Sequence, residues 1–121
     1  MKIVRTTVYE RRIEKLLTPE EQEKAENEIA DDPTAWPVIK GTGGMRKSRF
    51  GRDDLGKSGG GRIGYVFWEG YGTLYLLAAY PHNEKDNFSQ AERNAFKKLV
   101  KSLLKATRDE TERSKRAKSR G

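Results

Sequence analysis

Basic side chains that could hold a phosphate gather in the middle of the chain, around a stretch rich in glycine. Residues 40–62 carry seven Lys or Arg against two Asp, whereas residues 1–39 and 63–96 are mildly acidic. Glycine lets a backbone approach a phosphate closely, and cations on both sides would surround that phosphate with positive charge. The pattern predicts an anion site; the competing interpretation is a mobile surface loop. The cations concerned are Arg46, Lys47, Arg49, Lys57 and Arg62.

A second group of reactive side chains follows the last predicted strand. Tyr80, His82 and Lys85 bring a phenol, an imidazole and an ammonium to a strand exit, a combination suited to acid-base chemistry. His82 is the only histidine, which excludes a mechanism with two imidazoles and a histidine-cluster metal site. Two alternatives stay open for His82, which is either catalytic or faces solvent. Two also stay open for Tyr80, which either joins the core or turns its ring toward a base.

The segment 51–58, Gly-Arg-Asp-Asp-Leu-Gly-Lys-Ser, matches the nucleotide-binding P-loop pattern letter for letter. A P-loop needs a buried apolar strand before it and a helix directly after it, whose N-terminal amides hold the phosphates. Here three cations precede the segment and three glycines follow it. No carboxylate pair suits metal chemistry either. We therefore expect neither a nucleoside triphosphatase nor any cofactor or metal.

The composition limits the kind of protein. A chain of 121 residues with 34% hydrophobic residues supplies one modest core. It has no cysteine, its N-terminus lacks the apolar stretch of a secretory signal, and no window approaches the roughly 20 apolar residues of a membrane span. We therefore expect a cytoplasmic protein without membrane contact. The net charge of +7 favours a polyanionic partner, although a solvated basic surface would give the same total.

The front third of the chain is typical of a strand followed by two helices. Residues 3–9 are rich in β-branched side chains and predict the strand. Residues 13–17 have the apolar spacing of a short amphipathic helix. Residues 18–21 supply an N-cap, a first-turn proline and a capping-box glutamate for a second helix, which must stop near Asp32-Pro33. Its acidic run, residues 20–28, is interpreted as a solvent-facing surface.

Three strands are expected next, in an α+β fold. Residues 45–50 form the first, and residues 51–61 form a glycine-rich loop. Arg62 then opens the second strand, where a rigid backbone favours bidentate phosphate contact by its guanidinium. The near-continuous apolar run 73–80 predicts a central strand that is covered on both faces.

The C-terminal part combines a helix with a basic tail. A capping box at Ser89 and apolar residues at helical intervals up to residue 104 predict a helix that packs on the sheet. Residues 97–121 hold ten basic against three acidic residues, and few apolar ones after Thr107. We expect a compact domain over residues 1–107 and a flexible basic tail over 108–121. The two tryptophans, Trp36 and Trp68, are expected to seal the core.

This order of elements resembles the RelE superfamily of bacterial toxins, and the local strings resemble its HigB-type members. The resemblance covers roughly residues 3–105, and several strings occur in the same order. It implies a small RelE-like α+β fold with an N-terminal strand, two helices, a three-stranded antiparallel meander and a C-terminal helix. The strings are Asp31-Asp32-Pro33, Trp36-Pro37-Val38-Ile39, residues 41–47 (GTGGMRK), Gly56-Lys57-Ser58-Gly59-Gly60 before Arg62, and Ala79-Tyr80 leading to Asn83-Glu84-Lys85.

The resemblance also implies an activity. Proteins of this group are toxins of type II toxin-antitoxin systems. The implied activity is that of a metal-independent endoribonuclease (mRNA interferase), which enters the ribosomal A site and cuts messenger RNA. The position of His82 is commonly lysine in similar sequences, so the part that His82 plays stays open. By position, the catalytic residues would be Lys57, Arg62, Tyr80 and His82, and the RNA-binding residues Arg46, Lys47, Arg49 and Lys85.

The implied partners are messenger RNA on the ribosome and a cognate antitoxin, expected to be a small helix-turn-helix protein. Two alternatives remain beside the nuclease. One is a toxin of the related ParE type, which shares the fold but acts on DNA gyrase. The other is a non-catalytic module that binds RNA or the ribosome, whose affinity would fall with salt but which would leave no cleaved product.

Overall fold

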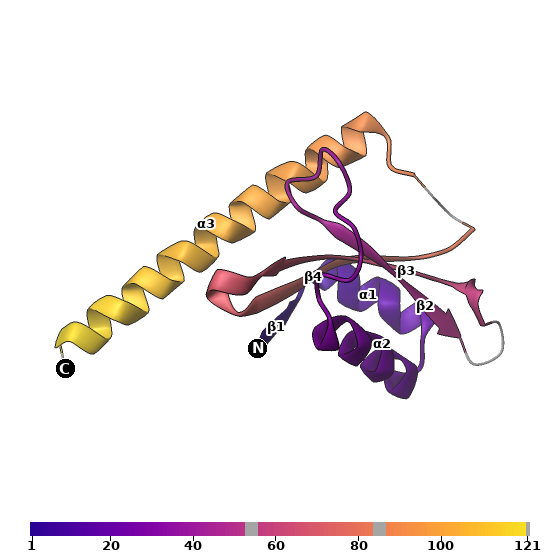
Figure 1. Ribbon diagram of the computed structural model, residues 1–121, viewed down its shortest axis with the longest axis horizontal. Helices are drawn as coiled ribbons and strands as arrows, with labels where there is room; N and C mark the ends of the chain where they lie inside the picture. The colour runs from indigo at the N-terminus through magenta and orange to yellow at the C-terminus, as the bar shows by residue number, and fades with distance from the viewer. Residues whose placement is uncertain (53–55, 84–86, 121) are drawn as a thin grey trace.

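The computed structural model of the chain describes residues 1–52, 56–83 and 87–120, and the side chains of residues 52, 56–59 and 118–120 lie outside that description. Its class is α+β, as predicted, with the expected order of strand, two helices, three strands and a C-terminal helix (Figure 1). The elements are β1 (Lys2–Arg5), α1 (Thr7–Leu16), α2 (Pro19–Asp31), β2 (Arg46–Arg52), β3 (Gly56–Trp68), the short 3-10 helix η1 (Glu69–Tyr71), β4 (Thr73–Pro81) and α3 (Gln90–Arg120).

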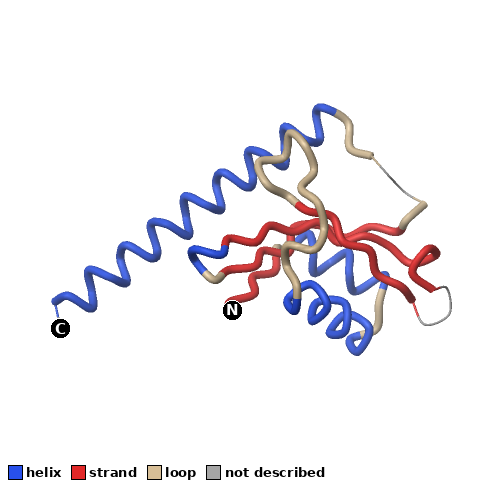
Figure 2. The backbone as a smooth tube through the Cα atoms, in the orientation of Figure 1, coloured by secondary structure: helices blue, strands red, loops and turns tan. Residues whose placement is uncertain are grey.

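The four strands form one sheet in the order β1-β4-β3-β2. β2, β3 and β4 make the predicted antiparallel meander, and β1 pairs with β4 in parallel. β4 is therefore an interior strand, and residues 73–77 are buried, as its apolar run predicts. Helices α1 and α2 cover one face of the sheet while α3 crosses the other (Figures 1 and 2). A core lies on each side of the sheet, and the half-buried Trp36 and Trp68 pack against these cores, as expected.

The first strand is shorter than its β-branched residues predict. β1 ends at Arg5 and α1 begins at Thr7, so the predicted strand over residues 3–9 is wrong in its second half. The reason is an N-cap: the hydroxyl oxygen of Thr6 accepts a hydrogen bond from the backbone N–H of Tyr9 at 3.1 Å. Such a cap stabilises a helix by about 1 kcal/mol. As a residue of α1, Tyr9 is fully buried in the core that α1 and α2 form with the sheet.

One glutamate of the acidic run is buried, which corrects its interpretation as a solvent-facing surface. Glu26 of α2 is only 4% exposed. Its carboxylate accepts hydrogen bonds from Arg5 Nε at 3.1 Å, the Tyr9 hydroxyl at 2.6 Å and the Gln22 amide at 2.9 Å. These donors come from β1, α1 and α2. The carboxylate therefore joins all three elements at one point.

The glycine-rich approach to β2 is a tight turn that rests on α3. Gly43 has φ +76°, and a Cβ there would lie 3.5 Å from Lys97 Cγ of α3. Beside it, the buried Thr42 donates a hydrogen bond to the Ile39 carbonyl at 2.7 Å and accepts one from the Met45 N–H at 3.1 Å. The turn needs glycine because φ is positive where the backbone approaches the helix. It fixes the point at which β2 begins.

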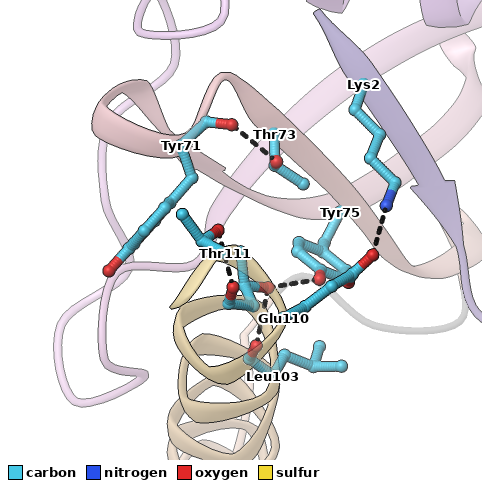
Figure 3. Close-up of polar contacts among 8 residues, drawn as sticks. Lys2, Tyr71, Thr73, Tyr75, Leu103, Glu110 and Thr111 are labelled. Atoms are coloured by element: carbon cyan, nitrogen blue, oxygen red, sulfur yellow. Dashed lines mark hydrogen bonds and ion pairs between the residues drawn. The ribbon is translucent and has the colours of Figure 1, made fainter. Parts of the chain in front are cut away.

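Helix α3 starts at the predicted capping box, where Ser89 and Glu92 exchange two hydrogen bonds of 2.9 and 3.1 Å. It continues to Arg120 and so includes residues 108–120 of the segment for which the sequence predicted a basic tail. Two contacts join α3 to the sheet: the Thr107 hydroxyl bonds with the Tyr75 hydroxyl, and Glu110 pairs with Lys2 at 3.5 Å. Figure 3 shows Tyr75, Glu110 and Lys2 at this point.

Beyond these contacts α3 projects away from the sheet (Figure 1). It remains helical there because Glu, Lys, Arg and Ala favour the helix and an established helix propagates easily. Within the described ranges, no helix is long and apolar enough to cross a membrane.

Candidate active site

Three side chains from three adjacent strands stand in a row across the sheet. Arg49 in β2 pairs with Arg62 in β3, and Arg62 pairs with Tyr80 in β4. Directly opposite residues of antiparallel strands share a face, and their Cβ atoms lie about 4.5–5.5 Å apart. The Arg49–Arg62–Tyr80 row is therefore contiguous. It brings together residues that the sequence separates by up to 31 positions.

The row lies on the face of the sheet that carries α3. The ring of Tyr80 contacts that of Phe88, just before α3, with a centroid distance of 5.7 Å. In β2, alternation places Lys47 and Arg49 on the same face as Met45. Met45 is buried in the core cluster that includes Val100 of α3. Lys47 therefore belongs beside the row, with Gly64 opposite it.

Arg62 is the centre of the row and is nearly buried, with 8% of its surface exposed. Its Nη1 donates a hydrogen bond to the Gly61 carbonyl at 3.0 Å. Among the described residues, no carboxylate forms an ion pair with it. A buried charge is costly unless an opposite charge compensates it. This guanidinium is therefore a fixed positive group that an anion would stabilise.

Arg49, exposed and directly opposite, adds a second positive charge. Like charges at opposing positions of a strand pair destabilise a sheet, and cross-strand pairs of this kind change stability by roughly 0.2–1 kcal/mol. Residues that break a local stability rule occur preferentially at functional sites. The pair Arg49 and Arg62, with Lys47 nearby, therefore favours an anion site over a solvated surface.

The glycines before Arg62 lie in β3 rather than in the loop predicted over residues 51–61. A Cβ at Gly60 would meet the Phe50 carbonyl oxygen at 2.0 Å, and one at Gly61 would meet the Phe50 ring at 2.5 Å. Glycine is needed here for the close approach of β2 and β3 rather than for a long flexible connection. Arg62 consequently stands inside a strand, instead of opening one, and its backbone is held on both sides.

The segment that matches the P-loop pattern belongs to this hairpin. Its first residues are in β2, residues 53–55 lie outside the described part, and Gly56 begins β3. β3 continues after the segment, so the helix that a P-loop requires there is replaced by a strand, where the sequence predicted a glycine-rich loop. Across the described ranges, no group of three His, Cys, Asp or Glu side chains is placed to hold a metal ion.

Arg46 does not join the row, although the sequence predicted it to bind RNA. Alternation directs it to the face of α1 and α2, where its Nη1 donates to the carbonyls of Thr34 at 3.2 Å and of Trp36. Tyr65, opposite Arg46, donates from its hydroxyl to the Pro33 carbonyl at 2.8 Å. Burial raises the pKa of Tyr65 to about 12, so this phenol stays protonated as a donor. Together they anchor the connection from α2 to β2.

The remaining candidates end or flank the row. Tyr80 is 6% exposed, which favours the alternative in which it joins the core. It lies on the same face of the sheet as Arg62, its partner on β3. His82 is half-buried, and its backbone N–H donates to the Gly60 carbonyl at 3.2 Å, which places its backbone near Arg62. The backbone of Lys57 lies in β3, but its side chain falls outside the description. Lys85 lies outside the described residues altogether.

Beside the row lies an apolar groove that the sequence analysis did not predict. It has a volume of about 430 Å³ and is formed by the start of α1, the end of β4 and the first turns of α3. Tyr80 belongs to both the groove and the row. No single segment carries a signal for it, because only the fold brings these three segments together.

A comparison with known protein families agrees with this arrangement. Residues 1–119 match the family described as the RelE toxin of the RelE / RelB toxin-antitoxin system. The match spans both strands that carry the two arginines, together with Tyr80 and most of α3. A toxin of this family has an antitoxin as its partner. The chain therefore belongs to the RelE toxin family and is the toxin of a toxin-antitoxin pair.

Proposed function

We propose that this toxin is a ribosome-dependent endoribonuclease of the HigB type, which cuts messenger RNA in the A site without a metal. The observation that supports the proposal best is the pair Arg49 and Arg62, two cations on adjacent strands, one of them buried without a carboxylate partner among the described residues. A scissile phosphate carries the charge that such a pair attracts, and two guanidinium groups can contact its oxygens bidentately.

The reaction uses a nucleophile of the RNA itself. A base removes the proton from a ribose 2′-hydroxyl, the 2′-oxygen forms a bond to the adjacent phosphorus, and the bond from phosphorus to the 5′-oxygen breaks. An acid then protonates the departing oxygen, leaving a 2′,3′-cyclic phosphate and a free 5′-hydroxyl. Arg49 and Arg62 stabilise the negative charge that grows on the phosphorane, which is the usual role of fixed cations in such a site.

The other residues take roles around that phosphate. Tyr80, packed next to Arg62, orients the nucleotide, and Lys47 and Lys85 hold the neighbouring backbone phosphates. His82 and Lys57 are the candidates for proton transfer, since an imidazole and an amine are both side chains that can serve as general acids or bases. The antitoxin, for which we propose a small helix-turn-helix protein, would cover this face of the sheet.

The experiment is primer extension on a message translated in a purified system. We expect wild-type toxin to produce new 3′ ends that require ribosomes, and Lys57→Ala to lower their yield by about 100-fold or more, because one group that stabilises or protonates the transition state is removed. Lys24→Ala is the matched control, since Lys24 is exposed on α2 and far from the row. It should cut like wild type.

The same assay separates the alternatives. A toxin that stops growth but leaves messenger RNA intact, while DNA damage signalling rises, would be of the gyrase-directed type. Salt-sensitive ribosome binding without new 3′ ends would indicate a non-catalytic module. Equal cleavage by Lys57→Ala and wild type would remove Lys57 from the mechanism.

A further inference from the structure

The outward side of α3 carries a continuous band of positive charge. Residues 93–108 contain six Lys or Arg and no Asp or Glu. Five of these cations are exposed and recur at helical spacing on one side of the helix. They are named here the α3 stripe: Lys97, Lys98, Lys101, Lys105 and Arg108. The buried side of the helix is the opposite one, where Val100 and Thr107 meet residues of the sheet.

The charges of the α3 stripe are not compensated. Among the described residues, no carboxylate forms an ion pair with any of its five cations. A helix surface that only faces solvent usually mixes both signs of charge, because Glu and Lys four residues apart stabilise each other. Here Lys97, Lys101 and Lys105 place like charges at that spacing, which destabilises a helix by about 0.2–0.5 kcal/mol per pair. Such a departure from a local stability rule favours a binding role.

The two faces of the sheet are covered by helices of opposite charge. α2 holds six Asp or Glu against one Lys, and it lies on the face opposite α3 (Figure 1). α3 lies on the face of the Arg49–Arg62–Tyr80 row, where Tyr80 contacts Phe88 just before the helix begins. The α3 stripe and the row are therefore two basic surfaces on the same side of the sheet. A polyanion is attracted to that side and repelled by α2.

The shape of the α3 stripe suits the backbone of a nucleic-acid helix. From Lys97 to Arg108 the stripe is about 16 Å long at the usual rise of 1.5 Å per residue. One strand of a duplex presents several phosphates over that length. Proteins that bind single strands add aromatic rings on which the bases stack. The aromatic residue of α3, Phe96, packs against the core instead. Contact with the stripe is therefore made by phosphate and sugar, the groups that double-helical RNA exposes.

We infer that the α3 stripe docks on the phosphate backbone of double-helical RNA in the ribosome, at a place separate from the message that is cut. The inference rests on the proposed action at the ribosome and adds an anchoring surface that does not touch the scissile phosphate. RNA is the occupant because the stripe and the row lie on the same side of the sheet, so one RNA assembly can contact both. The contact sets the affinity for the ribosome and leaves the chemical step unchanged.

The test follows single-turnover cleavage of one message at increasing ribosome concentration, which separates docking from cutting. Lys101→Gln combined with Lys105→Gln removes two central charges, and glutamine keeps a high helix propensity, so the helix is retained. The half-saturating ribosome concentration should rise by about tenfold or more, since each phosphate contact releases about 0.9 counterion. The slope of log affinity against log salt should become shallower by about one for each lysine. The rate at saturation should stay near that of wild type.

The matched control is Arg11→Gln combined with Lys24→Gln, which removes the same charge from exposed positions of α1 and α2. Its half-saturating concentration and salt slope should stay near those of wild type. An unchanged salt slope in the stripe variant would overturn the inference. A lower rate at saturation would overturn it as well, because the two lysines would then act in the reaction and not in docking.

A direct binding measurement keeps this test apart from the endonuclease proposal. Sedimentation of the toxin with ribosomes requires no cleavage. If wild type sediments with ribosomes and the stripe variant does so less tightly, but no message is cut, the endonuclease proposal fails and the docking surface stands. If the stripe variant cuts and sediments like wild type but binds its antitoxin less tightly, the stripe binds a protein and the inference is wrong.

Discussion

Arg62→Ala is expected to lower the single-turnover rate of messenger RNA cleavage on the ribosome by about 100- to 1,000-fold, because loss of one fixed group that stabilises transition-state charge has this effect in other enzymes. Arg62 is held inside β3 and is only 8% exposed, so its charge is fixed in place before negative charge develops beside it. Arg62→Lys should recover only part of the rate, since an ammonium keeps the charge but lacks the planar fork of the guanidinium.

The control for this prediction is another arginine. Arg46 lies on the neighbouring strand but points to the opposite face, where it holds backbone carbonyls. Arg46→Ala should lower the midpoint of urea unfolding while the cleavage rate of the folded fraction stays near wild type. Arg62→Ala should lower the cleavage rate of the folded fraction while the midpoint of urea unfolding stays near wild type. Cleavage by folded Arg62→Ala within threefold of wild type would remove this guanidinium from the reaction.

The second large effect concerns stability. Glu26→Leu should lower the free energy of unfolding by about 3 kcal/mol in urea titration, since removing one partner of a buried ion pair costs roughly 3–5 kcal/mol. We expect the lower end because the Arg5 side chain is 37% exposed. The Tyr9 hydroxyl would lose its acceptor inside the core. Glu23→Leu, an exposed position of the same helix, should change stability by less than about 0.5 kcal/mol.

The same carboxylate gives stability a pH dependence of known sign. Burial raises the pKa of Glu26, but the hydrogen bonds from Arg5, Tyr9 and Gln22 outweigh burial, so the pKa lies below its ordinary value of 4.5. Ionised Glu26 therefore stabilises the fold at neutral pH, and the contribution is lost as pH falls through the folded-state pKa. Glu26→Gln should be less stable than wild type at pH 7, and the gap should narrow in acid. A constant gap from pH 7 to pH 3 would contradict this account.

Local signals predicted much of the fold. The capping boxes at Thr18 and Ser89 act through neighbouring residues, so the starts of α2 and α3 could be read directly from the sequence. The apolar run of β4 likewise predicted an interior strand. The strand over residues 3–9 was wrong because one hydroxyl, that of Thr6, caps a helix where the β-branched residues around it favour a strand.

The candidate site could be predicted only in part, because its geometry depends on strand register. Sequence indicated Arg49 and Arg62 as cations, but not that they stand opposite each other, nor that Arg46 turns to the other face. The alternation of side chains along β2 decides which face Arg46 and Arg49 occupy. That alternation depends on the residue at which β2 begins, and the turn at Gly43 sets this residue. Glu26 was read as a surface residue because nothing local distinguishes it from the exposed Glu23 and Glu28.

The central claim is that Arg49 and Arg62, from separate strands, act on one RNA phosphate. A double-mutant cycle tests it most directly: single-turnover cleavage is measured for Arg49→Ala, Arg62→Ala and the combined variant on one ribosome-bound message. If both side chains stabilise the same transition state, the combined loss should be smaller than the product of the single losses, with a coupling free energy of about 1 kcal/mol or more. Losses that combine independently, within about 0.3–0.5 kcal/mol, would contradict the account.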